Sequence, residues 1–395
     1  MSTRPTIRLK PREGRRARAG APWIFSNEIV MGQATKALAP GTLVTVEADD
    51  RAAFGTGYFN PQSLIAIRLL DPVRDAEIGD AFFASHLARA LARRAHLFEQ
   101  PFYRLIHAEG DGLPGLTIDR FGDTFVAQVT TAGMEALTLP MLAALDEVAS
   151  PACVILRNDV PARAMEGLET YVRVARGEMP SRIAVEENGA RYFADLASGQ
   201  KTGWYYDQRD NRAFMAKLAK DRTVLDCYCY GGGFAIQAAL AGAKEAIGID
   251  SSQPALANAE ESAAANGVAK RCKFVKAEVF AELERLAAAS ESFDIVIADP
   301  PPFVKSRKDL EVGARAYRKL ARLAASVTGP GGYLLLASCS HNMPAERFAQ
   351  ESAIGIARAG RRASLIRQAG AGPDHPVHPM LSETSYLKAL VYALD

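Results

Sequence analysis

Apolar positions in the second half of the chain follow two alternating periods. Short apolar runs typical of buried strands recur there, separated by stretches with helical spacing. The predicted strands cover residues 223–229, 245–250, 273–275, 294–298 and 333–337. The predicted helices cover residues 234–242, 254–266, 279–289 and about 308–327. Strands that alternate with helices in this way indicate an α/β fold with a doubly wound, mostly parallel sheet.

The first half of the chain has a different pattern. Residues 42–48 and 64–70 alternate between apolar and polar side chains, as half-buried strands do, and glycines and prolines flank these runs. Residues 81–99 then have the spacing of a helix with one apolar face. The pattern therefore predicts a small β domain followed by a helix.

Strand and helix signals are mixed in the middle of the chain. Residues 116–119 and 124–129 predict a hairpin, residues 134–148 a helix and residues 153–157 a further strand. This block is too short for a complete nucleotide-binding fold and indicates an α+β domain. We therefore expect three domains, which are a small β domain at 1–80, an α+β domain at 81–188 and a doubly wound domain at 189–395.

The composition is that of a globular protein without a membrane segment. The 395 residues are 48% hydrophobic and 23% charged. No apolar stretch approaches the roughly 18 residues that a membrane span needs. The residues Met-Ser-Thr-Arg-Pro at the start form no apolar signal core, and the five cysteines show no disulfide pattern. These features predict a cytoplasmic protein.

Basic residues are concentrated near the start of the chain, although the net charge is only +2. The first 20 residues hold seven basic side chains against the single acidic residue Glu13. Such a cluster attracts phosphate backbones, and the alternative is a basic terminus that is merely solvated. The helix Arg89–Arg94 adds further cations. The candidate RNA-binding cations near the start are Arg8, Lys10, Arg12, Arg15 and Arg16.

A nucleoside-binding pattern lies in the doubly wound region. Strand 223–229 precedes three glycines, and the next strand ends at Asp250, which could accept both hydroxyl hydrogens of a ribose. There is no Gly-x-Gly-x-x-Gly, and Asp226 would repel a pyrophosphate but tolerate a cation. The pattern favours S-adenosylmethionine over a dinucleotide, while glycines that serve only a tight turn remain an alternative.

Side chains around this edge would complete the cofactor pocket. Glu278 could accept a hydrogen bond from the adenine amino group, while Asp207 and Arg209 could fix the methionine end. For Trp204, Tyr205 and Tyr206, the alternative is packing against the sheet. The predicted cofactor-binding residues are Gln208, Arg209, Asp226, Tyr228, Gly232, Asp250, Glu278 and Asp299.

Two predicted strands end in residues suited to covalent chemistry on a pyrimidine. One ends in Asp299-Pro-Pro and the other in Ser338-Cys339-Ser340. A thiolate that adds to carbon 6 of cytosine makes carbon 5 nucleophilic, and an acid beside the ring nitrogen offsets the developing charge. Cys339 and Asp299 are the predicted catalytic residues, and the alternative for Cys339 is an inert buried thiol.

The predicted nucleophile needs an activating group. A free thiol titrates near pH 8.5, so some neighbour must favour the thiolate. No Lys or Arg is adjacent in sequence, and the visible candidates are His341 and a helix that starts near Pro344. His375 and His378 alternate with prolines and could border the base pocket. No cysteine spacing predicts a zinc site.

Motifs along nearly the whole chain resemble one known family. They are Pro-Trp-Ile-Phe-Ser (22–26), residues 103–122, Lys-Thr-Gly-Trp-Tyr-Tyr-Asp-Gln-Arg-Asp (201–210), Asp-Pro-Pro (299–301) and Ser-Cys-Ser (338–340). Together they resemble the RlmI-like bacterial class I methyltransferases, which make 5-methylcytosine in large-subunit (23S) ribosomal RNA.

The resemblance implies a Rossmann-like methyltransferase domain, an N-terminal PUA domain that grips RNA, with Trp23 among its contacts, and a central α+β domain. It also implies S-adenosylmethionine as the cofactor, Cys339 as the nucleophile, ribosomal RNA as the partner, a homodimer and no metal. The chain departs from the family in having Pro302 where Lys is common, Gly231 for Thr, Glu278 for Asp, and His341-Asn342 for Gly-Leu.

Three other functions remain open from the sequence. The first is methylation of a guanine nitrogen, because such enzymes also hold the base with Asp-Pro-Pro but need no thiol. The second is an RNA-binding assembly factor with a vestigial cofactor site. A dehydrogenase is the most distant alternative.

Overall fold

The computed structural model describes residues 4–196 and 202–395, which form two compact units. The first unit comprises residues up to Ser181 together with two returning segments, Leu196–Gly203 and Pro373–Thr384. The second unit comprises Arg182–Asp195, Trp204–Gly372 and Ser385–Asp395. The predicted division into three domains stays a prediction, although the second unit begins at Arg182 instead of residue 189.

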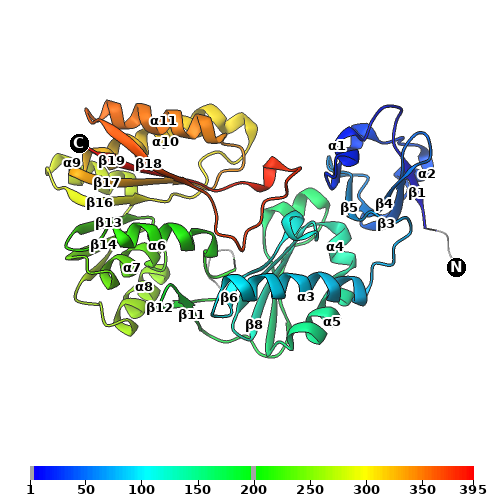
Figure 1. Cartoon of the computed structure of the whole chain (residues 1–395), viewed down its shortest axis with the longest axis horizontal. Helices are drawn as coiled ribbons and strands as arrows, with labels where there is room; N and C mark the ends of the chain where they lie inside the picture. Colours follow the sequence, from blue (N-terminus) through cyan, green and yellow to red (C-terminus); the bar gives the residue numbers. More distant parts are fainter. Residues whose placement is uncertain (1–3, 197–201) are drawn as a thin grey trace. The chain divides into compact units, whose positions relative to one another are not determined.

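A small five-stranded sheet forms the start of the first unit (Figure 1). Its order is β1-β3-β4-β5-β2, in which only the β1–β3 pair is parallel. Its strands are β1 (Thr6–Arg8), β2 (Trp23–Ile24), β3 (Thr42–Glu47), β4 (Ala53–Phe59) and β5 (Ile67–Asp71). Its short helices are α1 (Arg15–Arg18), η1 (Ser26–Glu28) and α2 (Gln33–Lys36). The buried residues Ile24, Val44 and Phe59 belong to its core, which confirms the predicted small β domain.

A second five-stranded sheet follows, in the order β10-β9-β8-β7-β6. Its strands are β6 (Phe102–His107), β7 (Leu116–Phe121), β8 (Thr124–Val129), β9 (Cys153–Asn158) and β10 (Tyr171–Arg176). Its helical segments are α3 (Asp80–Leu97), η2 (Ala108–Asp111), α4 (Ala132–Ala136), α5 (Thr138–Ala149) and η3 (Pro161–Glu166). Phe83 of α3, Met141 of α5 and Phe125 of β8 share one apolar core, as amphipathic helices on a sheet require. The predicted α+β region is confirmed.

One predicted surface cation of α3 is buried. Only 1% of Arg94 is exposed, and its guanidinium forms a bidentate pair with Asp111 at 2.7 Å for both bonds. Such a pair satisfies the charge inside the unit. The expectation that Arg94 contacts RNA is therefore wrong, because the pattern placed it on or near the side opposite the apolar face and did not show the acid that covers it.

A seven-stranded sheet forms the centre of the second unit, in the order β15-β14-β13-β16-β17-β19-β18. Its strands are β13 (Thr223–Cys227), β14 (Glu245–Asp250), β15 (Cys272–Lys276), β16 (Phe293–Ala298), β17 (Thr328–Ser338), β18 (Ala363–Ala369) and β19 (Lys388–Leu394). All neighbours are parallel except the pairs that involve β19. The doubly wound sheet is thus confirmed, with a closing antiparallel hairpin that was not predicted.

Helices cover both faces of this sheet, with α6, α7 and α8 on one side and α10 and α11 on the other (Figure 1). They are α6 (Arg209–Lys217), α7 (Gly233–Leu240), α8 (Gln253–Ala265), α9 (Val279–Ala288), α10 (Leu310–Ser326) and α11 (Ala345–Arg358). The short 3-10 segments are η4 (Tyr206–Gln208), η5 (Arg307–Asp309) and η6 (Ser382–Thr384), the last of which belongs to the first unit. A separate hairpin of β11 (Ile183–Glu187) and β12 (Ala190–Ala194) packs against α8.

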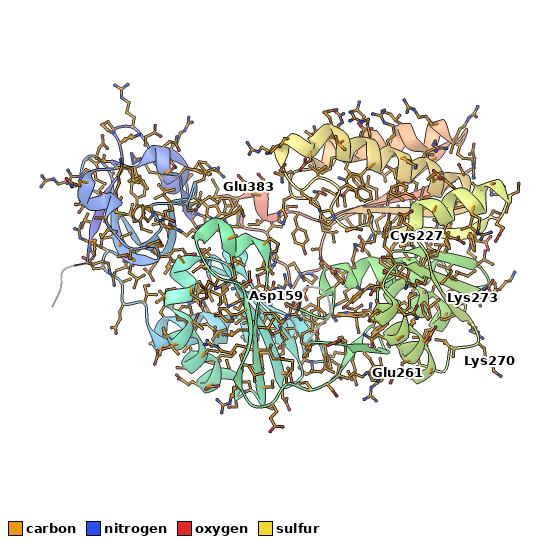
Figure 2. The ribbon with its side chains drawn as sticks, turned by 180° about the vertical axis from the view of Figure 1, so that it is seen from behind. Asp159, Cys227, Glu261, Lys270, Lys273 and Glu383 are labelled. Atoms are coloured by element: carbon orange, nitrogen blue, oxygen red, sulfur yellow. The ribbon has the colours of Figure 1, made fainter. Side chains whose placement is uncertain are left out.

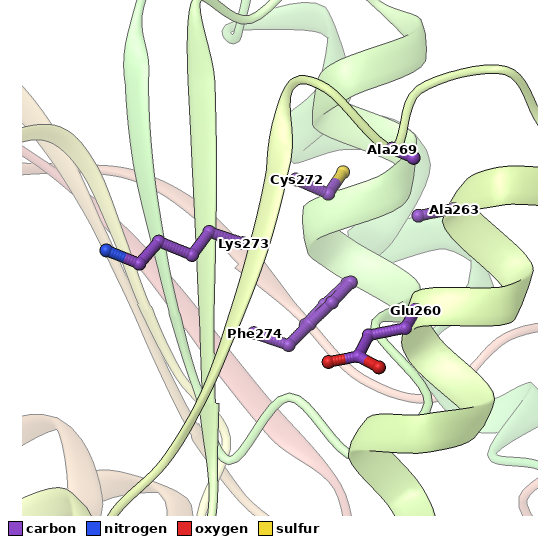
Figure 3. Close-up of a pocket in the computed structure, with 6 residues that line it drawn as sticks. All are labelled: Glu260, Ala263, Ala269, Cys272, Lys273 and Phe274. Atoms are coloured by element: carbon purple, nitrogen blue, oxygen red, sulfur yellow. The ribbon is translucent and has the colours of Figure 1, made fainter.

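Cys227 and Cys272 of this unit differ in their surroundings. Cys227, labelled in Figure 2, is fully buried in β13. Cys272 instead lines a cavity of about 270 Å³ between α8 and the edge strand β15, beside Glu260 and Phe274 (Figure 3). Cys272 pairs in register with Ala246, near the start of β14, so this cavity lies away from the carboxyl ends of the strands.

Candidate active site

Cys339 and the Asp299 loop meet at the carboxyl ends of two adjacent parallel strands. β16 ends one residue before Asp299, and β17 ends one residue before Cys339. The Cys339 Sγ lies 3.9 Å from the carbonyl oxygen of Pro300, and the residue is half-buried. The predicted proximity of the two tips is confirmed, and the thiol is not packed in the core.

Hydroxyl groups hold these two tips together. The Tyr317 hydroxyl of α10 lies 2.8 Å from both the Ser338 and the Ser340 hydroxyl oxygens. Ser340 Oγ also accepts a hydrogen bond from the backbone N–H of Val304, which follows the Asp-Pro-Pro segment. A buried hydroxyl network of this kind fixes local geometry when every member has a partner. The sequence reading missed Tyr317, because nothing near its position marks it as a contact of the distant Ser-Cys-Ser turn.

Lys388 lies next to the same turn and was also missed. It begins β19, where it pairs with Ser338 across the antiparallel ladder, and only 8% of it is exposed. Its Nζ donates to the carbonyl oxygens of Ser340 at 2.7 Å and Met343 at 2.9 Å. Burial lowers the pKa of Lys388 to about 8, while nearby Cys339 acts in the opposite direction.

An aromatic group lies near both candidate catalytic residues. Burial raises the pKa of Tyr205, and Tyr230, Asp207, Asp299 and Cys339 raise it further. Its ring packs edge to face on Tyr230, with centroids 5.2 Å apart. Tyr205 therefore lies near enough to Asp299 and Cys339 for their charges to act on its phenol.

The predicted activating residue His341 takes part in a ring stack. Its centroid lies 5.1 Å from that of Tyr386, at an interplanar angle of 27°. The Tyr386 hydroxyl donates to Asp207 Oδ2 at 2.6 Å, so this stack connects the Ser-Cys-Ser turn with the segment before α6. The helix predicted near Pro344 is α11. An activating role for either feature stays a prediction.

The loop after β13 adopts an unusual backbone. Tyr228, Tyr230 and Gly232 have φ angles of 62°, 48° and 76°. Bulky residues in this region are strained, and such strain is typical of ligand sites. A Cβ on Gly232 would lie 3.0 Å from the Phe274 ring and from the Ala259 Cβ, so a side chain would be crowded there. The sequence predicted the glycine turn but not the two strained tyrosines.

Acidic residues line the ends of β13 and β14. Asp226 is 1% exposed, and its Oδ2 accepts a hydrogen bond from the Ala235 N–H at 3.0 Å. Burial raises the pKa of Asp226 to about 7, and nearby Asp299 acts in the same direction. Asp250 is half-buried and accepts from the backbone N–H groups of Tyr230 at 3.0 Å and Ser252 at 2.8 Å.

The other predicted cofactor residues are ordered by local hydrogen bonds. Gln208 is buried and accepts from Asn211 at 2.7 Å, and the Arg209 guanidinium lies over the Tyr206 ring at 5.2 Å. Glu278 caps α9 by accepting from the Ala281 N–H at 2.9 Å. Their roles stay predictions. Lys201 of the quoted motif lies outside the described residues.

A buried ion pair anchors the segment that carries these residues. Arg212 and Glu187 pair at 2.5 Å, and Glu187 also accepts from the Trp204 indole N–H at 3.0 Å. The Arg212 guanidinium lies 4.7 Å from the centroid of the Trp204 ring and donates to the Tyr205 carbonyl. The sequence reading missed both charged residues, because Glu187 belongs to the unpredicted β11–β12 hairpin.

Comparison with known proteins gives the family. Residues 7–72 match a PUA-like domain, and residues 169–392 match an S-adenosylmethionine-dependent methyltransferase. The ribosomal RNA large subunit methyltransferase I of Pseudoalteromonas atlantica is 37% identical, over 94% of each chain, and that of Shewanella denitrificans is 37% identical, over 98% of each. The chain belongs to the RlmI-like family of S-adenosylmethionine-dependent methyltransferases.

Solved structures share the fold of this RlmI-like methyltransferase. A SAM-dependent methyltransferase from Streptococcus mutans has a TM-score of 0.83 at 21% identity, over 98% of this chain and 100% of that one. A methyltransferase complexed with SAH has a TM-score of 0.85 at 20% identity, with the same coverage. The predicted fold class, a Rossmann-like domain with an N-terminal PUA-like domain, is confirmed.

The residues at the sheet edge fit S-adenosylmethionine, the cofactor of this family. When bound, the cofactor supplies an electrophilic methyl group on a cationic sulfonium. Asp226 carries negative charge for a cationic group, Asp250 offers acceptors for ribose hydroxyls, and the strained loop around Gly232 lets the backbone approach a ligand. We expect these three residues and Arg209 to hold the cofactor.

The raised pKa of Asp226 predicts pH-dependent cofactor binding. Above about pH 7 the carboxylate is charged and attracts the cationic cofactor, and below it protonation removes that attraction. We expect affinity to fall by up to about tenfold per pH unit below 7, as measured by calorimetry. Asp226→Asn should bind more weakly and show a flat profile, whereas an unchanged profile in this variant would contradict the assignment.

Stability should have the opposite pH dependence. The native state keeps this proton between the ordinary aspartate pKa of 3.8 and the raised pKa of about 7, where the unfolded chain has lost it. Burial of the Asp226 charge therefore lowers stability as pH rises through that window. The effect of cofactor binding can therefore be separated from that of folding.

Several predicted RNA-binding side chains of the PUA-like domain have partners within the first unit. Arg8 lies 3.8 Å from Glu47, and Arg16 lies 3.2 Å from Glu383. Lys10 donates to the Asn27 carbonyl at 2.7 Å, and the Trp23 indole N–H donates to Glu109 at 2.8 Å. Surface ion pairs of this kind are weak and can exchange for phosphates.

Arg12 and Arg15 are the most available of these cations. Both are exposed, and neither guanidinium has a partner within residues 4–196 and 202–395. Their charges can therefore meet an RNA backbone without breaking an internal contact. RNA binding by the six predicted residues stays a prediction. Across the same described ranges, no helix combines the length and apolar character that crossing a bilayer requires.

Proposed function

We propose that this methyltransferase transfers a methyl group from S-adenosylmethionine to carbon 5 of a cytosine in large-subunit ribosomal RNA, through a covalent adduct with Cys339. The observation that carries the proposal is the half-buried Cys339 thiol beside the Asp299-Pro-Pro loop, with Sγ 3.9 Å from the Pro300 carbonyl. The names of the curated relatives support large-subunit ribosomal RNA as the substrate.

Cys339 and Asp299 have complementary roles in this proposal. The Cys339 thiolate forms a bond to carbon 6, and the electron pair displaced from the ring makes carbon 5 nucleophilic. Asp299 gives a proton to the adjacent ring nitrogen and so offsets the charge that develops during addition. After methylation, loss of the carbon 5 proton to a base expels the thiolate, and the nitrogen returns its proton to Asp299.

The target cytosine has to leave any helix before it reaches Cys339. Sequence-specific RNA enzymes act on unpaired or flipped-out bases, which they stack on aromatic side chains. Tyr205, close to both Asp299 and Cys339, offers such a surface, and the basic start of the PUA-like domain would contact the RNA backbone.

Nucleoside analysis tests the proposal. Large-subunit RNA that lacks the modification is incubated with the protein and S-adenosylmethionine, digested and examined by mass spectrometry. We expect one additional 5-methylcytidine. A methylated guanosine would overturn the proposed base, and bound cofactor without turnover would favour an assembly factor.

A further inference from the structure

A buried ammonium group lies beside the Ser-Cys-Ser turn, and among the described residues its hydrogen-bond partners are neutral carbonyl oxygens. The Nζ of Lys388 donates to the Ser340 and Met343 carbonyls, on the chain that leaves Cys339. Carbonyl dipoles offset part of the cost of removing a charge from water, but they carry no negative charge. A buried cation in this position still needs a counter-ion.

Cys339 is the ionisable group that acts on this ammonium. Across the described ranges, no carboxylate pairs with Lys388, and the third N–H of its ammonium has no acceptor there. Cys339 alone raises the pKa of Lys388 against the effect of burial. A thiolate at residue 339 would therefore be the counter-ion that the ammonium lacks.

The two phenols and the carboxyl group near Cys339 do not supply a positive charge. Burial raises the pKa values of the Tyr205 and Tyr317 phenols, which keeps both neutral. The Asp299 carboxyl group, when charged, opposes a second negative charge nearby. His341, two residues after Cys339 in the sequence, is stacked on the Tyr386 ring. The Lys388 ammonium of β19 is a cation that can offset these effects.

We propose that Lys388 stabilises the thiolate form of Cys339 and fixes the turn that carries it. Lys388 acts through Cys339 and is a positioning residue. Its use in catalysis rests on the proposed function, but the ionisation of Cys339 does not, because thiol reactivity can be measured without RNA. The hydrogen bonds of the Lys388 Nζ to the Ser340 and Met343 carbonyls place the ammonium at this turn.

The pH dependence of alkylation tests the proposal. The full-length protein is treated with iodoacetamide between pH 5 and 10, and labelling of each cysteine is followed by peptide mass spectrometry. Lys388→Met removes the charge and keeps most of the stem. We expect the pH midpoint of Cys339 alkylation to rise by about one pH unit in this variant, with about tenfold slower labelling at pH 7.

Two internal comparisons separate charge from structure. Lys388→Arg keeps a permanent charge and should retain the low midpoint of the unaltered protein. Cys272, in the cavity at the edge strand, should react identically in all three proteins. Burial raises its pKa most strongly and Asp226 raises it further, while Lys388 has no part in the shift. An unchanged Cys339 midpoint in folded Lys388→Met would overturn the proposal.

The reverse measurement applies if Lys388→Met does not fold. In Cys339→Ala, the Lys388 titration followed by lysine NMR should shift to lower pH, because the neighbouring anion is gone. An unchanged Lys388 titration would overturn the proposal. If Cys339→Ala still methylates RNA while the alkylation results hold, the proposed function fails and the thiolate assignment stands.

Discussion

Cys339→Ala is expected to lower the rate of RNA methylation by on the order of 10³-fold or more, with little change in cofactor affinity. Without a nucleophile at carbon 6, carbon 5 of cytosine stays too electron-poor to attack a methyl sulfonium. The half-buried thiol contributes little to packing, so the variant should fold normally. Single-turnover methylation of ribosomal RNA and cofactor calorimetry measure the two quantities.

A covalent trap distinguishes loss of the nucleophile from loss of RNA binding. RNA that contains 5-azacytosine should form an adduct with the unaltered protein that survives denaturation, and peptide mapping should locate it at Cys339. Cys339→Ala should form no adduct. Cys272→Ala is the matched control, since Cys272 lies near the start of the edge strand and should leave both adduct and rate unchanged. Full methylation by Cys339→Ala would exclude the thiol mechanism.

Periodicity was sufficient to predict several of the buried elements of the doubly wound sheet. The apolar run at 245–250 is β14 residue for residue, and the helix at 254–266 is α8 to within one residue. These elements have long apolar runs and end at clear signals such as Gly267. β18 was missed because it is largely exposed and therefore lacks a regular pattern. β19 was missed although its residues after Lys388 are apolar and nearly all buried, so its pattern was present but not recognised.

The proximity of the two strand ends that carry Asp299 and Cys339 was predictable from the sequence. Asp299 and Cys339 follow adjacent apolar runs, and parallel strands bring their carboxyl ends to one edge. Lys388 and Tyr317 could not be found in this way, because their relation to Cys339 depends on pairing with β19 and on packing of α10. The prediction that Arg94 contacts RNA was wrong for the same reason, since its partner Asp111 lies on another element.

The contacts at the sheet edge therefore divide by function. The residues that we expect to contact the ligands follow strand ends, where the sequence shows them, whereas the residues that hold them in place come from elements distant in sequence. Tyr317 contacts the Ser338 and Ser340 hydroxyls, and Ser340 in turn accepts from the Val304 backbone N–H. Glu187 fixes the segment before α6 through Arg212. Substitution of Tyr317 or Glu187 should loosen the arrangement of the site residues without removing a reactive atom.

Asp299→Asn is expected to slow methylation by about 10²- to 10⁴-fold, the usual contribution of a positioned general acid. The amide keeps the shape of the carboxyl group but cannot give a proton to the ring nitrogen. Because Asp299 acts while the thiolate adds, formation of the 5-azacytosine adduct should slow by a similar factor. Adduct formation is measured by quenched-flow with denaturing electrophoresis.

A second aspartate on the same strand provides the control for this prediction. Asp294 lies at the opposite end of β16, where it accepts hydrogen bonds from Thr223 that lower its pKa. Asp294→Asn should cost stability, because its carboxylate loses these charge-assisted bonds, but should leave the adduct rate unchanged. If Asp299→Asn instead forms the adduct at the unaltered rate and only binds S-adenosylmethionine more weakly, Asp299 is a cofactor ligand and the proton at the ring nitrogen comes from another group.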